Sequence, residues 1–242
     1  VWRWETLVER DDVVASAKLR PLGEQEVHFG YLFGIMVEKG SELPEGDPRR
    51  YFKYRVVFQG NRVRDQNFET AMFQDLGSSP ATMEASKAAD FHGCLPGNDT
   101  EIADAERAYI QARLKGIETW IMLPKERWPQ EWIDKGMEKP VVRLCRALYG
   151  HPDSGTFWEE HCDAAVQEVG FVVIESWPSV YYHPLLKLVL AIYVDDFKMA
   201  GPTNTSTHVG KTSQIHCPRP GHIRHTWSLL GMQATRSRST SD

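Results

Sequence analysis

Two adjacent acidic residues stand between two apolar arms in the stretch from Leu188 to Gly201, and this stretch constrains the fold more than any other. Short apolar runs on either side of a polar turn are typical of a β-hairpin. We therefore expect a hairpin that carries Asp195 and Asp196 near its turn. Adjacent carboxylates at the end of a buried strand repel each other and resist desolvation, so such a site costs stability unless a cation binds.

A divalent cation would resolve this conflict between the two carboxylates. Mg²⁺ prefers oxygen ligands, typically one or two carboxylates together with substrate phosphates and water, as in enzymes that transfer phosphoryl or nucleotidyl groups. The alternative is that the acidic pair only forms the turn, because Asp is frequent in turns for its local hydrogen bonds. The pair by itself leaves both interpretations open.

A third carboxylate, Asp104, is a candidate partner for the pair. Asp is a preferred N-cap residue, so Asp104 could instead cap a helix formed by Ala105 to Leu114. The residue types alone do not separate a metal ligand from a helix cap.

The charge of the chain is unevenly distributed. A net charge of −5 over 242 residues, taken alone, disfavours a nucleic-acid binder, because counterion release rewards clustered Lys and Arg. Residues 49–64, however, contain six Lys or Arg residues and no acidic residue, with four aromatic residues among them. We call residues 49–64 the basic patch, and we expect a strand over residues 51–58 within it.

Two helices are predicted from their start and stop signals. The first follows Ser79-Pro80 and ends near His92, since Ser is a good N-cap and Pro suits the first helical position. The second runs from Ser154 to Gly170, and strands are expected at 171–174 and 180–183. The residues expected on the buried faces are Met83, Ala88 and Phe91 in the first helix, and Phe157, His161, Ala164, Ala165 and Val169 in the second.

Cysteine usage and hydropathy exclude several classes of protein. The four cysteines are widely spread and form no CxxC pair, which disfavours a disulfide framework and fits a reducing compartment. The longest apolar run, residues 185–194, is about half the length that spans a bilayer, so no membrane role is expected.

One further hypothesis is a zinc site formed by His216, Cys217, His222 and His225, although their spacing is not that of a common zinc module.

Four motifs resemble those of copia-type retrotransposon reverse transcriptases, in the order of that family. Tyr193-Val194-Asp195-Asp196 resembles the signature tetrad, and Asp104 followed by Ala108-Tyr109 resembles the first palm motif. Residues 142–150, followed by Phe157-Trp158, are similar to the leucine-tyrosine-glycine segment of the family and its downstream tryptophan. The fourth motif, residues 53–57 with Gly60, resembles the basic fingers strand.

This resemblance implies an α+β fold with a right-hand polymerase palm and fingers, in which helices pack on one face of an antiparallel sheet. It implies an RNA-directed DNA polymerase in which Asp104 and Asp195 bind two Mg²⁺ or Mn²⁺ ions and Asp196 supports the site. The implied partners are an RNA template, a DNA primer, deoxynucleoside triphosphates and other domains of a Pol polyprotein. The implied location is intracellular, in the cytoplasm or nucleus.

The resemblance also implies roles for four nucleotide-binding residues. Lys53 and Arg55 would contact the incoming triphosphate, Tyr109 would exclude a 2′-hydroxyl from beneath the sugar, and Gly155 would allow close backbone approach. The chain departs from the family after Gly150, where residues 151–155 replace a Lys-Gln pair and a Pro. The Gln that touches the template-nucleotide pair in the family is therefore missing.

We expect three regions along the chain: an N-terminal segment of unknown role at 1–48, fingers and palm at 49–201, and a degenerate or disordered tail at 202–242 in which no thumb is recognisable. These features are those of an isolated polymerase segment. An alternative to an active polymerase is a catalytically inactive palm-fold remnant that binds nucleic acid weakly through the basic patch.

Overall fold

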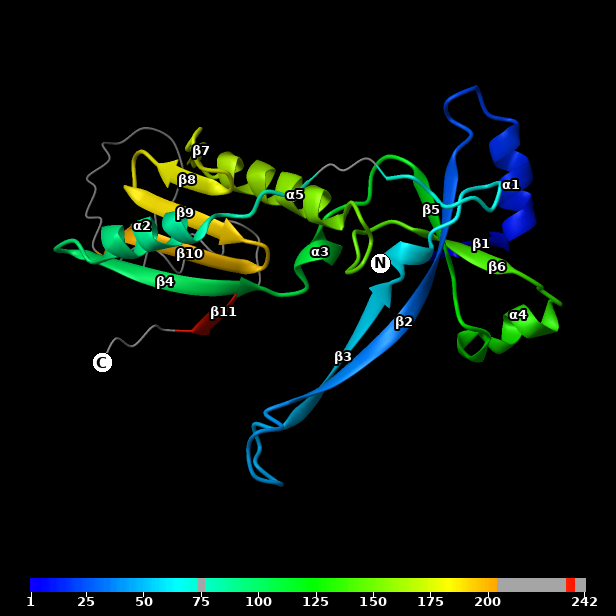
Figure 1. Cartoon of the computed structure of the whole chain (residues 1–242), viewed down its shortest axis with the longest axis horizontal. Coiled ribbons are helices and arrows are strands. Elements are labelled where there is room, and N and C mark those ends of the chain that lie inside the picture. The colour runs from blue at the N-terminus through cyan, green and yellow to red at the C-terminus, as the bar shows by residue number, and fades with distance from the viewer. Residues whose placement is uncertain (74–76, 204–233, 238–242) are drawn as a thin grey trace, which may run out of the picture. The chain divides into compact units, whose positions relative to one another are not determined.

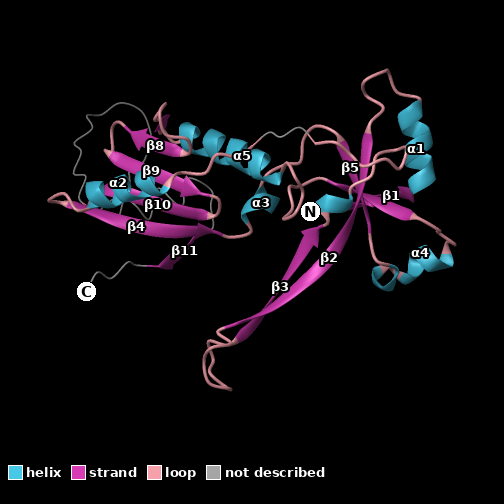
Figure 2. Ribbon diagram, in the orientation of Figure 1, coloured by secondary structure: helices cyan, strands magenta, loops and turns pink. Residues whose placement is uncertain are grey.

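The computed structural model describes residues 1–73, 77–203 and 234–237, in which helices and two β-sheets form an α+β fold, as the sequence predicts (Figures 1 and 2). The chain divides into two compact units. The first unit comprises Val1–Leu76 and Tyr109–Phe157, and the second comprises Gly77–Ala108 and Trp158–Asp242. Within the described ranges, no helix is both long enough and apolar enough to cross a membrane.

The first unit is built on a five-stranded sheet in the order β1-β6-β5-β2-β3. Its neighbouring strands are antiparallel except for β2 and β5, which are parallel. The strands are β1 (Trp2–Glu9), β2 (Val27–Lys39), β3 (Tyr51–Phe58), β5 (Glu118–Met122) and β6 (Pro140–Leu144). The helical elements are α1 (Arg10–Lys18), the 3-10 turns η1 (Gly60–Arg62) and η2 (Lys125–Arg127), and α4 (Gln130–Asp134).

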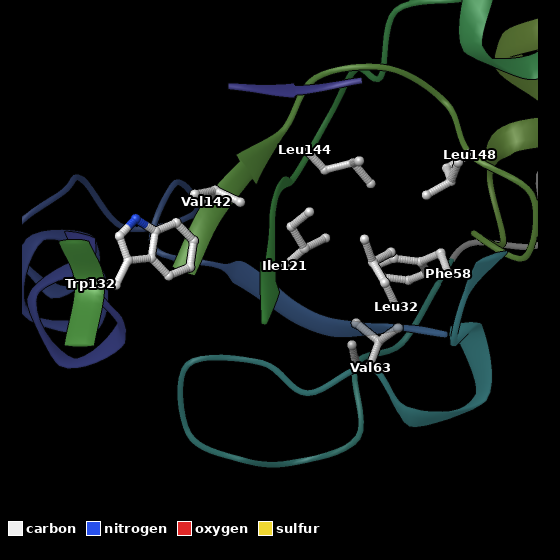
Figure 3. Close-up of a cluster of buried hydrophobic side chains, with 9 residues drawn as sticks. Leu32, Phe58, Val63, Ile121, Trp132, Val142, Leu144 and Leu148 are labelled. Atoms are coloured by element: carbon white, nitrogen blue, oxygen red, sulfur yellow. The ribbon is translucent and has the colours of Figure 1, made fainter. Parts of the chain in front are cut away.

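The core of the first unit collects side chains from four of these strands and from α4 (Figure 3). Leu32 of β2, Phe58 of β3 and Ile121 of β5 are buried together with Val142 of β6 and Trp132 of α4. The strand expected at 51–58 is confirmed, and its last residue anchors it in this core because Phe58 is 1% exposed.

Two glycines of separate sequence motifs meet beside this core. The Phe58 backbone N–H donates to the Tyr149 carbonyl over 2.7 Å, which draws the two chain segments together. A Cβ on Gly60 would overlap the carbonyl oxygen of Gly150, and a Cβ on Gly150 would overlap the carbonyl oxygen of Phe58. Gly150 also has φ 89°, a conformation that side chains disfavour. Both positions therefore require glycine.

The second unit is built on a six-stranded, fully antiparallel sheet in the order β11-β4-β10-β9-β8-β7. The strands are β4 (Asn98–Ala105), β7 (Val172–Val173), β8 (Val180–His183), β9 (Leu188–Tyr193), β10 (Asp196–Pro202) and β11 (Ala234–Ser237). Its helices are α2 (Met83–Gly93) and α5 (Ser154–Glu168), of which α5 begins within the first unit, and the short α3 (Ala108–Gln111) follows β4 along the chain.

The two long helices cover opposite faces of this second sheet, so the prediction that helices pack on one face is wrong. Lys198 of β10 donates to Asp90 of α2 over 2.8 Å. The preceding residue, Phe197, packs against Trp158 of α5 with ring centroids 6.4 Å apart. Successive strand residues point to opposite faces. Helices cover both faces of the sheet because β9 is almost continuously buried, so side chains on both of its faces need apolar neighbours.

The expected boundary at residue 48 does not separate compact units. The part of β2 from Leu32 to Lys39 lies before residue 48 and pairs with β3, which lies after residue 48. At the other end, Pro202 closes β10, and β11 at residues 234–237 pairs with β4. Residues 204–233 and 238–242 lie outside the described residues, and so do most of the tail expected at 202–242 and the four residues of the zinc hypothesis.

Candidate active site

The acidic pair lies at the end of the predicted hairpin. β9 and β10 are joined by the two residues Val194 and Asp195, and Tyr193 pairs with Asp196 across the turn. Val194 has φ 55°, which tight hairpin turns require but β-branched residues disfavour. The turn is therefore locally strained, and its conformation depends on support from outside the hairpin.

Two hydrogen bonds provide this support by holding the carbonyls of both turn residues. The indole Nε1–H of Trp158 donates to the Val194 carbonyl over 2.6 Å, and the Trp158 side chain is buried. The Ala105 backbone N–H donates to the Asp195 carbonyl over 2.7 Å. The tryptophan downstream of the Tyr149-Gly150 motif thus contacts the acidic hairpin.

Replacing Trp158 with Phe removes the donor and leaves the Val194 carbonyl without that partner. We expect the free energy of unfolding to fall by about 1–3 kcal/mol. Urea unfolding followed by circular dichroism measures this change. Trp177→Phe, a change at a more exposed tryptophan of the same unit, is the matched control. Equal unfolding midpoints for the two variants would show that the indole hydrogen bond does not support the turn.

Asp104 lies on β4 directly opposite Asp196 of β10 in the antiparallel register. Side chains at such positions share one face of the sheet, with Cβ atoms roughly 4.5–5.5 Å apart. Asp104 does not cap a helix, because it is a strand residue and α3 begins only at Ala108. The three carboxylates that the sequence singled out are therefore neighbours along the sheet, with Asp104 and Asp196 opposite each other and Asp195 in the adjoining turn.

These carboxylates repel one another. The pKa of Asp196 is raised above its ordinary value of 3.8 by partial burial, by the charge of Asp195 and by the charge of Asp104. Over residues 1–73, 77–203 and 234–237, no three His, Cys, Asp or Glu side chains converge closely enough to form a ready metal site. The three oxygen donors nevertheless have the chemistry that Mg²⁺ prefers, and a bound cation would relieve their repulsion.

Replacing Asp104 with Asn is expected to lower the pKa of Asp196 towards 3.8 without reaching it, because burial and Asp195 remain. A raised carboxyl pKa means that the folded state binds the proton more tightly than the unfolded state. In metal-free buffer the wild type should therefore lose stability as pH rises above 3.8 through the raised pKa, more than the variant does. Carboxyl ¹³C NMR titration measures the shift. An unchanged Asp196 titration would contradict the cross-strand interaction.

The basic patch separates into paired and unpaired cations. Arg50 pairs with Glu38 over 2.7 Å, and Arg49 pairs with Asp47 over 2.8 Å. Lys53 and Arg55 are exposed on β3 and take part in no ion pair within the part of the chain that the structure describes. The charge of these two residues, predicted to bind the triphosphate, is therefore available to a ligand, as is that of the exposed Arg62 and Arg64.

Sequence analysis missed a third cation on the same face of the hairpin of β2 and β3. Lys39 is the last residue of β2 and lies opposite Tyr51 of β3 in the strand register. This register places Lys39 on the same face as Lys53 and Arg55. This face also carries Phe33, Ile35 and Val37, all partly exposed. The alternation of side chains along β2 could have indicated that Lys39 belongs to this face, but only if the register of β2 against β3 had been known.

The remaining predicted residues belong to the first unit. Tyr109 is half-buried and packs edge-on against Tyr149, with ring centroids 4.5 Å apart. Gly155 lies in the first turn of α5. Tyr109 and Gly155 thus share a unit with Lys53 and Arg55, whereas the three carboxylates belong to the second unit.

The chain matches no protein-family model and no curated protein. The resemblance to reverse transcriptases therefore rests on the four sequence motifs, and the activity that it implies is a proposal.

Proposed function

We propose that this chain is the fingers and palm of a copia-type retrotransposon reverse transcriptase, an RNA-directed DNA polymerase. The observation that carries the proposal is the position of Asp104 directly opposite Asp196, with Asp195 in the adjoining turn. Three carboxylates from two distant segments of the sequence are costly as neighbours without a cation. Enzymes that transfer nucleotidyl groups use such a set to bind divalent ions.

In this proposal Asp104 and Asp195 hold two Mg²⁺ or Mn²⁺ ions, and Asp196 supports the site. Bound ions supply charge stabilisation to the attacking hydroxyl and to the triphosphate. The chain contributes positioning. The indole of Trp158 and the backbone N–H of Ala105 fix the turn, so that the carboxylates keep their places during a reaction.

The reaction joins a deoxynucleotide to a DNA primer on an RNA template. An ester bond forms between the primer 3′-oxygen and the α-phosphorus, the bond to pyrophosphate breaks, and the hydroxyl proton passes to solvent. Lys53 and Arg55 bind the triphosphate as charged donors, since neither takes part in an ion pair among the described residues. Tyr109 excludes the 2′-hydroxyl, and Gly155 permits close backbone approach.

A second candidate function is that of an inactive palm-fold remnant that retains nucleic-acid binding. Two observations favour it: the template-contacting Gln of the family is missing from residues 151–155, and three cations share one exposed face of the first unit. In either case the proposed location is inside the cell, in the cytoplasm or nucleus, and further Pol-derived domains are expected as partners.

Extension of a DNA primer on an RNA template tests the proposal. With Mg²⁺ or Mn²⁺ the wild type should extend the primer, and Asp195→Asn should not. Salt-dependent binding of the primer-template without extension would identify the inactive remnant. If the wild type shows neither extension nor binding, both candidate functions are wrong.

A further inference from the structure

A pocket in the first unit is lined by four arginines. It has a volume of about 460 Å³, and Arg3, Arg113, Arg143 and Arg146 line it without any acidic residue. They come from β1, from β6 and from the segments that follow α3 and β6. The proposed function uses none of these residues.

The backbone places the four arginines in two like-charged pairs. Arg3 of β1 lies directly opposite Arg143 of β6 in the antiparallel register. Arg113 and Arg146 face each other in an isolated antiparallel bridge. Like charges at directly opposite positions destabilise a sheet. The fold therefore holds two repelling pairs around one pocket.

Neighbouring acidic groups offset only part of this charge. Arg143 pairs with Glu118 over 3.0 Å, but Glu118 also pairs with Arg20 over 2.8 Å. Arg3 lies 4.0 Å from Glu5, and both side chains are well exposed, so this pair contributes little.

The positive charges of the second pair, Arg113 and Arg146, are balanced even less by neighbouring acidic groups. Arg146 donates to the Gln111 carbonyl over 2.7 Å, a contact that orients the guanidinium without neutralising it. Arg113 is exposed and has no ion pair within the ranges that the structure describes. An anion in the pocket would relieve the repulsion that the chain itself leaves uncompensated.

The residue type indicates which anion fits. Guanidinium groups bind phosphate through two parallel hydrogen bonds, whereas a single carboxylate would not satisfy four of them. The volume of the pocket lies in the range of small-ligand sites. We propose that this pocket binds adjacent phosphate groups, supplied by a free polyphosphate or by successive phosphates of a nucleic-acid strand. The proposal does not rest on polymerase activity.

Pyrophosphate is the probe, titrated in metal-free buffer at low ionic strength. At a concentration about 100 times its Kd, it should raise the Tm of the wild type by roughly 5–10 °C. Arg113→Gln and, separately, Arg3→Gln should each weaken binding by at least about tenfold, measured by calorimetry. Both residues are exposed, so the variants should keep the wild-type circular dichroism. Arg127→Gln, an exposed arginine of the same unit outside the pocket, is the control.

A second arm distinguishes the sources of phosphate. If a single-stranded oligonucleotide displaces pyrophosphate and loses affinity in Arg113→Gln, the pocket binds a nucleic-acid strand. If it does not displace pyrophosphate, the pocket binds a free polyphosphate. The proposal is overturned if pyrophosphate does not bind, or if Arg113→Gln and Arg127→Gln bind it equally. Because no activity is measured, failure of the polymerase proposal leaves this result unaffected.

Discussion

Replacing Asp104 with Asn is expected to lower primer extension by at least about 100-fold. Replacing a residue that only supports a metal ligand already costs about 10–100-fold in activity, and the proposed function makes Asp104 a ligand itself. The same change should stabilise the metal-free protein, because it removes the charge opposite Asp196. We expect the Tm to rise by roughly 1–4 °C in chelator at low salt. Lost activity with gained stability is the signature of repelling carboxylates that a cation must bridge.

Asp99→Asn is the matched control for this prediction. Asp99 lies on the same strand and is exposed, but its partner across the sheet is Gly201 rather than an acidic residue. It should retain extension and show no comparable gain in Tm. If Asp104→Asn extends the primer as well as Asp99→Asn does, Asp104 is not part of the site.

Replacing Gly150 with Ala is expected to lower the free energy of unfolding by at least about 3 kcal/mol. The added Cβ would overlap the Phe58 carbonyl oxygen, a backbone atom that is fixed by the β2-β3 pairing and cannot move aside cheaply. The left-handed backbone at φ 89° adds a further penalty for any side chain. Urea unfolding followed by tryptophan fluorescence measures the loss.

Gly46→Ala separates the effect of the Cβ overlap from the effect of the left-handed backbone conformation. Gly46 has nearly the same backbone angle, φ 87°, but a Cβ there meets no atom within 4 Å. It should cost only about 1 kcal/mol, from the backbone conformation alone. Equal losses at the two positions would mean that the close approach of residues 58 and 150 does not limit substitution.

The sequence predicted the elements whose signals are local. The hairpin around Asp195 and the strand at 51–58 followed from apolar runs and turn residues, and both are confirmed. The first long helix was predicted in the right place, although Thr82 caps it instead of Ser79. Thr82 accepts a hydrogen bond from the Ala85 N–H, and either residue type is a suitable cap, so only the tertiary structure decides.

The buried faces of the helices were predicted less well. In α2, Met83 and Phe91 are exposed, whereas Ala85 and Ala89 are buried, because small residues let this helix lie close to the sheet. Size and hydrophobicity alone favoured the larger residues.

In α5 the buried face is displaced by about one residue from the prediction. Trp158, Cys162 and Val166 are buried, together with the correctly predicted Phe157. Helical periodicity fits two neighbouring stripes equally well. The contacts of Trp158 with Val194 and Phe197 fix the rotation of the helix, and these contacts link residues far apart in the sequence.

The pairing of Asp104 with Asp196 was not accessible from local sequence rules. Those rules favoured a helix cap, because Asp followed by Ala is a common helix start. The strand pairing of β4 with β10 places Asp104 instead, and register between distant strands depends on the whole sheet. Only the family resemblance suggested that the three carboxylates would be neighbours.

Electron paramagnetic resonance titration with Mn²⁺ tests the central claim most directly. The wild type should bind one or two Mn²⁺ ions per chain, and Asp104→Asn and Asp196→Asn should each weaken that binding by at least about tenfold, with Asp99→Asn unchanged. Mn²⁺ binding that is identical in the wild type and in the variants at positions 104 and 196 would show that these facing carboxylates do not hold a divalent ion.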